Sequence, residues 1–180
     1  MIEGKIVNLR AREMTDLANF TRWINDTEVT RHLSMRYQMS LLAEEKWLSE
    51  LVSQPMAYDR VAFSIDTKDG VHIGSLNYHI IVPEERKASL GIMIGEKEYW
   101  AKGYGTDAIV TLLRFGFDEM NLNRVELRVF ADNARAIACY RKCGFVEEGR
   151  LRQDRFARGE YTDTHIMGIL RDEFYSLHGK

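Results

Sequence analysis

The sequence has few of the residues that mark disulfide-rich, collagen-like or disordered chains. Two cysteines and two prolines occur in 180 residues, and no tract is biased in composition. The cysteines, Cys139 and Cys143, lie four residues apart in a segment with helical periodicity, and no histidine pair stands near them. This spacing argues against a disulfide framework and against a zinc site. We therefore expect a reducing, cytoplasmic setting and no bound metal.

The sequence also lacks a surplus of one charge and a long apolar run. It carries 25 basic and 27 acidic residues, so the concentrated basic face that nucleic-acid binding needs is not indicated. The longest apolar candidate, residues 108–117, is interrupted by Arg114 and is shorter than the roughly 20 residues that span a bilayer. The first five residues include an acid and lack the apolar centre of a signal peptide. We expect neither nucleic acid nor a membrane as a partner.

What is present is enough apolar material for the core of one domain. Hydrophobic residues make up 45% of the chain, and we expect residues 1–180 to form a single domain. Alternating patterns and turn residues predict strands at 6–11, 60–67, 71–82, 87–95, 124–131, 145–149 and 161–170. Apolar residues at helical spacing predict helices at 105–120 and 133–142, and two earlier helices that follow caps at Thr15 and Ser40. We expect Asn133 to cap the helix at 133–142 and Gly144 to end it in the left-handed conformation. Asp69 and Gly70 predict a hairpin turn at 68–70. These elements predict an α+β fold with a mixed, twisted sheet.

A glycine-punctuated loop joins the strand that ends near residue 95 to the helix that follows. Its central residues are Lys102, Gly103, Tyr104, Gly105 and Thr106. The two glycines allow backbone amides to turn toward a ligand, and the positive end of the helix attracts an anion such as a pyrophosphate. An ordinary loop is the alternative, because two glycines at this spacing are common. The Gly-Lys-Ser/Thr of a Walker loop is missing, and the loop follows an antiparallel meander rather than a parallel strand.

About thirty residues later the chain carries the pattern N-x-x-A-I-x-x-Y-x-K-x-G-F at residues 133–145. With the K-G-x-G of the loop, this stretch resembles the GNAT superfamily of acetyl-CoA-dependent N-acetyltransferases, and the resemblance runs from Ile73 to the end of the chain. Residues 23–29 and 151–167 are similar to the Rim-type branch. That branch includes ribosomal-protein N-terminal acetyltransferases and relatives acting on polyamines and amino sugars. Trp100 departs from the family, which often has Gln or Arg at that position.

The resemblance implies a fold and a set of cofactor contacts. It implies a mostly antiparallel sheet that splays between the strands near 88–95 and 124–131, flanked by helices. In such enzymes the first of these strands offers backbone groups to the pantetheine arm of acetyl-CoA, and the glycine loop holds the pyrophosphate. The resemblance therefore assigns cofactor binding to Ile92, Met93, Ile94, Lys102, Gly103, Tyr104, Gly105, Thr106, Asn133, Ala136 and Tyr140.

The chemistry of amide formation assigns two catalytic candidates. A primary amine must lose a proton, and the leaving thiolate must gain one. Tyr140, which the resemblance places near the sulfur, is the candidate acid, although its helical spacing from Ile137 also suits a plain core residue. Glu126 is the candidate base because it faces away from Val125 and Leu127 on its strand, toward either a cleft or solvent. Weaker candidates for the base are Glu98, His79 and Asp163.

The sequence thus predicts transfer of acetyl from acetyl-CoA to a primary amine by direct attack in a ternary complex. A protein N-terminus is slightly favoured as the acceptor over a polyamine or an amino sugar. Two other classes stay open: a catalytically silent CoA-binding regulatory module, and a nucleotide-binding protein that uses the same glycines. Homodimers are common in the Rim-type branch, so a homodimer is a further expectation.

Overall fold

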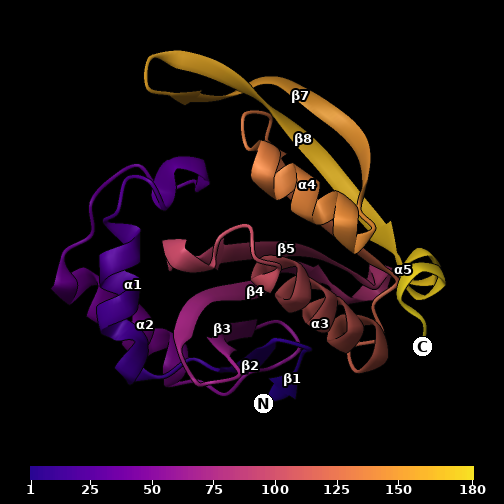
Figure 1. The fold of residues 1–180 in the computed structure, drawn as a ribbon, viewed down its shortest axis with the longest axis horizontal. Coiled ribbons are helices and arrows are strands. Elements are labelled where there is room, and N and C mark those ends of the chain that lie inside the picture. Colours follow the sequence, from indigo (N-terminus) through magenta and orange to yellow (C-terminus); the bar gives the residue numbers. More distant parts are fainter. The chain divides into compact units, whose positions relative to one another are not determined.

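The computed structural model describes residues 1–180 and shows an α+β fold with one eight-stranded sheet (Figure 1). The strands are β1 (Ile2–Glu3), β2 (Val7–Ala11), β3 (Val61–Thr67), β4 (His72–Val82), β5 (Lys87–Ile94), β6 (Arg124–Phe130), β7 (Val146–Ala157) and β8 (Glu160–Leu170). The α-helices are α1 (Leu17–Ile24), α2 (Leu41–Val52), α3 (Tyr104–Asp118), α4 (Ala134–Cys143) and α5 (Arg171–His178). The order of strands is β1-β2-β3-β4-β5-β6-β8-β7. The pairs β1–β2, β2–β3, β6–β8 and β7–β8 are antiparallel, and β5–β6 is parallel, which confirms the predicted mixed sheet.

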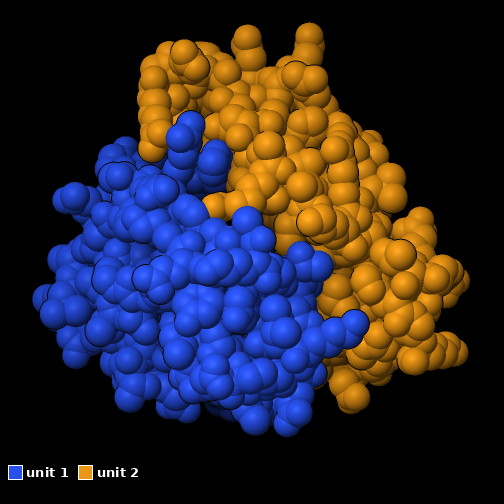
Figure 2. All heavy atoms as spheres, in the orientation of Figure 1, with its two compact units in different colours: residues 1–77, 92–108 blue, residues 78–91, 109–180 orange.

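The chain divides into two compact units (Figure 2). Unit 1 comprises residues 1–77 and 92–108, and unit 2 comprises residues 78–91 and 109–180. Strands β4 and β5 and helix α3 each contribute a segment to both units.

In unit 1 the helices α1 and α2 bury an aromatic and aliphatic cluster. Phe20, Trp23, Val29 and Leu48 form its centre, and Trp100 packs against it. Phe20 and Trp23 lie three residues apart and therefore share one face of α1. Their rings meet edge to face with centroids 5.8 Å apart. The apolar face that the sequence predicts for this helix is thus the face that packs into the core.

The helix caps of unit 1 are only partly as predicted. Ser40 caps α2, since its hydroxyl oxygen accepts the Ala43 N–H at 3.2 Å. Thr15 does not cap a helix; it lies inside a short 3₁₀ turn, Met14–Asp16, that precedes α1. Asp16 fixes this turn because its carboxylate accepts the backbone N–H of Glu13 at 3.0 Å. The prediction missed strand β1, whose two residues are too few to show a period.

In unit 2 the long antiparallel β6–β8 ladder runs from Arg124↔Leu170 to Phe130↔Thr164. The parallel β5–β6 ladder is much shorter and covers only Lys87–Ser89 against Arg124–Glu126. Leu90 has no β6 partner, so the two strands of this unit part after three residue pairs. The predicted splay therefore begins within unit 2.

Two elements of unit 2 differ from the prediction. Strand β7 continues to Ala157 instead of ending near Gly149, and it forms a long hairpin with β8 around the turn at Arg158 and Gly159. Helix α5 was not predicted. Its Phe174 is fully buried and lies 5.2 Å from Phe117 of α3, centroid to centroid, and Tyr175 packs against the same Phe117 ring at 6.4 Å.

Candidate functional site

The glycine loop of unit 1 ends in an open helix start. Ala101 and Gly103 adopt left-handed backbone conformations, with φ of 57° and 90°, and α3 begins at Tyr104. The Asp107 N–H donates to the Gly103 carbonyl at 2.9 Å and closes the first turn. The amides of Tyr104 and Gly105 precede it, and the first amides of a helix have no intrahelical acceptor. This geometry fits the predicted anion site.

The two glycines of the loop have different roles, which the sequence did not distinguish. Gly103 needs the left-handed conformation, whereas Gly105 lies in the first helical turn and is not among the residues with positive φ. A Cβ on Gly103 would meet only Ile6 Cδ1, at 3.8 Å, which is an ordinary contact. The requirement for glycine at 103 therefore comes from backbone conformation and not from crowding.

Asp107 anchors the first turn of α3 to the N-terminal strands of unit 1. Its carboxylate accepts three consecutive backbone N–H groups, from Lys5 at 3.1 Å, Ile6 at 2.8 Å and Val7 at 3.0 Å. Sequence reasoning missed this residue because the partners lie about a hundred positions away. The turn that begins the predicted phosphate site is thus fixed from outside the helix.

The predicted pantetheine strand, Ile92–Ile94, is held closely within unit 1. A Cβ on Gly74 would overlap the Met93 carbonyl oxygen, so only glycine permits β4 to approach β5 this closely. The Trp100 indole N–H donates to the Ile94 carbonyl at 2.7 Å. Trp100, the departure from the family pattern, therefore occupies the last carbonyl of the strand and packs on the aromatic cluster.

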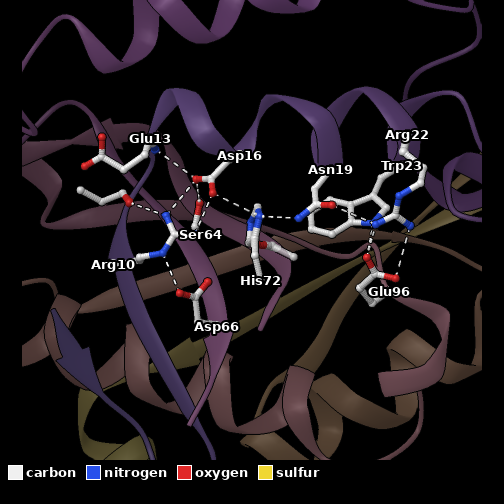
Figure 3. Close-up of polar contacts among 12 residues, drawn as sticks. Arg10, Glu13, Asp16, Asn19, Arg22, Trp23, Ser64, Asp66, His72 and Glu96 are labelled. Carbon is white, nitrogen blue, oxygen red and sulfur yellow. Dashed lines mark hydrogen bonds and ion pairs between the residues drawn. The ribbon is translucent and has the colours of Figure 1, made fainter. Parts of the chain in front are cut away.

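A chain of polar contacts runs beneath α1 in unit 1 (Figure 3). Arg10 donates to Asp16 at 2.7 and 2.9 Å and to Asp66 at 2.7 Å, and the Ser64 hydroxyl donates to Asp16 at 2.7 Å. Burial alone would raise the pKa of Asp16, but the hydrogen bonds from Arg10, Glu13 and Ser64 outweigh burial and hold it below its ordinary value. Asp16 is therefore a charged, structural carboxylate.

His72 continues this chain toward β5. Its Nδ1 lies 3.3 Å from Asp16 Oδ1 and 3.3 Å from Asn19 Nδ2, and its Nε2 lies 3.0 Å from the Gly74 carbonyl oxygen. The carbonyl can only accept, so Nε2 carries a hydrogen and donates. Burial lowers the pKa of His72, and the nearby Asp16 carboxylate only partly offsets this effect. The neutral ring then accepts the Asn19 amide at Nδ1.

The predicted site residues of unit 2 lie on and before helix α4. Asn133 caps the helix: its side-chain oxygen accepts the Ala136 N–H at 3.2 Å. Gly144 ends the same helix with φ of 101°, as its position after Cys143 predicted. Asn133 thus fills the cap role expected of it, and Ala136 takes part through its backbone. Their roles toward acetyl-CoA stay predictions.

Tyr140 is buried on α4 with 9% of its surface exposed. Its ring meets Phe145 edge to face at 6.0 Å, and burial, together with Cys139 and Cys143, raises its pKa above the ordinary value. The hydroxyl makes no hydrogen bond within the protein, and it is not among the fully buried polar atoms without a partner. It is therefore protonated at neutral pH and keeps access to whatever contacts its remaining exposed surface.

Glu126 lies on β6 among hydrogen-bond donors of unit 2. Arg124 approaches one carboxylate oxygen at 3.2 Å, and the Ser89 hydroxyl approaches the other at 3.4 Å. Each oxygen accepts one hydrogen bond and keeps a second lone pair, so the carboxylate can still accept a proton. Of the weaker candidates, Asp163 accepts hydrogen bonds from the Gln153 N–H and from Arg150, which lower its pKa and reduce its strength as a base.

Two further features bear on the predicted partners. No group of three or more His, Cys, Asp or Glu side chains is placed to hold a metal ion. None of the helices combines the length and the apolar character that crossing a membrane requires.

Comparison with known proteins places these residues in a family. Residues 7–146 match the family model described as an acetyltransferase (GNAT) domain. The N-acetyltransferase p20 of Bacillus licheniformis is 26% identical over 169 residues, covering 93% of this chain and 94% of that protein. A putative ribosomal N-acetyltransferase of Bacillus subtilis, YdaF, is 32% identical over 106 residues, covering 59% of this chain and 57% of that protein.

A solved structure extends the likeness to three dimensions. The crystal structure of spermidine N-acetyltransferase from Vibrio cholerae, in complex with CoA and spermine, matches with a TM-score of 0.83 and 27% identity. The match covers 93% of this chain and 97% of that one. Since the family model spans well over half of the sequence, this chain belongs to the acetyltransferase (GNAT) domain family and is an N-acetyltransferase.

Proposed function

We propose that residues 1–180 act as one domain that transfers acetyl from acetyl-CoA to a primary amine by direct attack in a ternary complex. The observation that carries the proposal is the junction at residues 101–107. There a left-handed Gly103 leads into the first turn of α3, in the loop that follows β5. Acetyl-CoA would supply an activated thioester. The chain's own groups would bind it and move protons.

The residues of unit 1 would bind the cosubstrate. Backbone amides at the start of α3, with Gly103 and Lys102, would hold the pyrophosphate through amide donors and the positive helix end. Backbone groups of Ile92–Ile94 would bind the pantetheine arm and stabilise negative charge on the acetyl oxygen. The glycine at 74 and the indole of Trp100 support this role because they fix the segment's backbone.

Two side chains of unit 2 would move protons. The Tyr140 hydroxyl would protonate the departing thiolate, since it has no hydrogen bond within the protein to give up. Glu126 would receive the proton of the amine, directly or through water, on a lone pair that the hydrogen bonds from Arg124 and Ser89 leave free. Asn133 and Ala136 would support the cosubstrate at the start of α4.

We propose a polyamine as the acceptor. The support is the likeness to the Vibrio cholerae enzyme, whose structure matches over 93% of this chain. The paired acids at 147–148 do not decide the matter, because side chains of unit 2 already contact them: His165 Nδ1 lies 2.7 Å from Glu147, and Arg124 pairs with Glu148. A protein N-terminus, which the sequence slightly favoured, becomes the second candidate.

The test is thiol release from acetyl-CoA over a panel of amines. Spermidine, spermine, an amino sugar and peptides beginning with Ala, Ser or Thr would be compared at equal concentration, with Tyr140→Phe as the matched control. We expect the highest kcat/KM with spermidine or spermine. Highest activity with a peptide would replace the polyamine proposal by the second candidate.

Two outcomes would overturn the enzyme proposal itself. Binding of CoA without thiol release for any amine would indicate a silent CoA-binding module. A rise in Tm with ATP or NAD but not with CoA would indicate a nucleotide-binding protein. A homodimer and a cytoplasmic location remain part of the proposal, and sedimentation of the purified chain would test the first.

A further inference from the structure

Glu96 holds the end of β5 in unit 1, and the proposed chemistry does not use it. It lies two residues after Ile94, the last residue of the segment proposed to bind pantetheine. Its carboxylate accepts the Trp23 indole N–H at 3.2 Å and two N–H groups of Arg22, one of them at 3.3 Å (Figure 3). The hydrogen bonds from Arg22 lower the pKa of Glu96, so it stays charged and is a poor base.

The backbone around Glu96 is fixed at the same place. The N–H groups of Gly95 and Glu96 both donate to the Ile73 carbonyl, at 2.9 and 3.2 Å. A Cβ on Gly95 would overlap the indole of Trp23, which is itself buried. The peptide after β5 therefore lies directly on an aromatic side chain of α1, and no larger residue fits there.

Arg22 is in turn oriented by its own neighbours. It donates to the Asn19 side-chain oxygen at 3.0 Å, and its guanidinium carbon lies 5.7 Å from the centroid of the Trp23 ring. The Asn19 amide faces His72, and His72 donates to the Gly74 carbonyl. Gly74 meets Met93. The polar chain that starts at Glu96 thus returns to the same strand.

We propose that Glu96, together with Arg22, is a positioning residue for acetyl transfer. It would fix the β5 segment 92–94 and the start of the glycine loop against α1. This inference rests on the proposed function of those two parts. The side chains of Arg22 and Glu96 are 54% and 23% exposed, and ion pairs this open to solvent contribute little to stability. This pair holds the end of β5 and yet contributes little to stability. We therefore expect its role to be the positioning of the backbone there.

The test separates position from stability. The test compares three variants, Glu96→Ala, Arg22→Ala and the double variant, with the control Glu119→Ala. The control removes an exposed carboxylate that lies outside this polar network. Hydrogen exchange of the amides at 92–95 reports the geometry without any ligand. The dissociation constant of CoA, KM for acetyl-CoA and kcat report its use. Melting temperatures report stability.

We expect faster exchange at 92–95 in both single variants, and a CoA Kd raised about five- to tenfold, the range that coupled networks show. The effect of the double variant should be smaller than the sum of the two single effects, because both single variants remove the Arg22–Glu96 ion pair. Glu96→Gln should recover part of the affinity, since its amide oxygen still accepts the Trp23 N–H. The melting temperature should change little in Arg22→Ala and in Glu96→Gln, which both keep an acceptor for the Trp23 N–H. The Glu119→Ala control should match the original protein in every measurement.

Three outcomes would overturn the inference. Unchanged exchange at 92–95 would show that the pair does not hold the strand. Faster exchange with an unchanged CoA Kd and KM would show that the strand's position does not matter to the cosubstrate. If the unaltered protein failed to bind CoA, the proposed function would fail first and the positioning role with it. Measuring the unaltered protein before any variant distinguishes these cases.

Discussion

Replacing Tyr140 by Phe should separate catalysis from stability. The change keeps the ring that packs against Phe145 and removes only the hydroxyl. Because that hydroxyl makes no hydrogen bond within the protein, its loss leaves no partner unsatisfied. Leaving a buried polar group unpaired costs about 1–3 kcal/mol. The Phe variant should therefore be equal to the original protein in unfolding free energy, or more stable by up to about 1 kcal/mol, since the hydroxyl keeps some exposure.

The catalytic effect should have the opposite sign. General acid catalysis contributes about 10²–10⁴-fold, and a CoA thiolate is a fair leaving group without help, so kcat should fall by about 10². CoA affinity should stay within about twofold, because no bond to the cosubstrate depends on the phenol alone. Denaturant unfolding, calorimetric titration with CoA and thiol release with saturating amine give the three numbers. A full kcat in the variant, with chemistry shown to limit turnover, would refute the reasoning and leave Tyr140 a packing residue.

The remaining predictions concern unit 1. Gly103→Val should raise the CoA Kd more than Lys102→Ala, because a branched residue at φ of 90° is strained by about 1–3 kcal/mol, whereas an exposed charge contributes about 0.2–1 kcal/mol. Titration with CoA compares the two variants, and a larger effect of Lys102→Ala would contradict this order. Gly74→Ala should lower the unfolding free energy by about 1–3 kcal/mol, since β4 must move away from the Met93 carbonyl; urea unfolding measures it, and an unchanged midpoint would contradict the clash. Because the pKa of His72 is lowered in the folded protein, the unfolded chain binds its proton at a higher pH than the folded protein does. The unfolding free energy should therefore fall as the pH drops below about 6.5, by at most about 1.4 kcal/mol per pH unit for this one group. His72→Gln should reduce this dependence on pH, as measured by urea unfolding.

Local signals in the sequence predicted much of the fold. The helix from Asn133 to Gly144 was predicted almost to the residue, because both its cap and its left-handed terminator are encoded by side chains within it. The turn at residues 68–70 was predicted for the same reason, with Gly70 at φ of 81°. The resemblance to a family added the splay between β5 and β6.

What the sequence could not predict depends on contacts between distant residues. Asp107 looks like an ordinary helix acid until its partner on β2 is known, and Glu96 looks like an ordinary loop acid until its partner on α1 is known. Gly74 reads as a weak point in a strand until Met93 is seen against it. Helix α5 and the long hairpin of β7 and β8 were missed because their polar sequences show no clear period, and burial of Phe174 and pairing across the hairpin decide their structure.

The anchoring of three N-terminal amides by Asp107 has a consequence for how the chain folds during synthesis. The segment at Lys5–Val7 leaves the ribosome about a hundred residues before its acceptor does. At about 5–20 residues per second, roughly 5–20 s pass before those amides can find their partner. Contacts of such long range slow folding because a large loop must close before they form. The hydrogen bonds between Asp107 and residues 5–7 can therefore form only late, after the start of α3 has been synthesised.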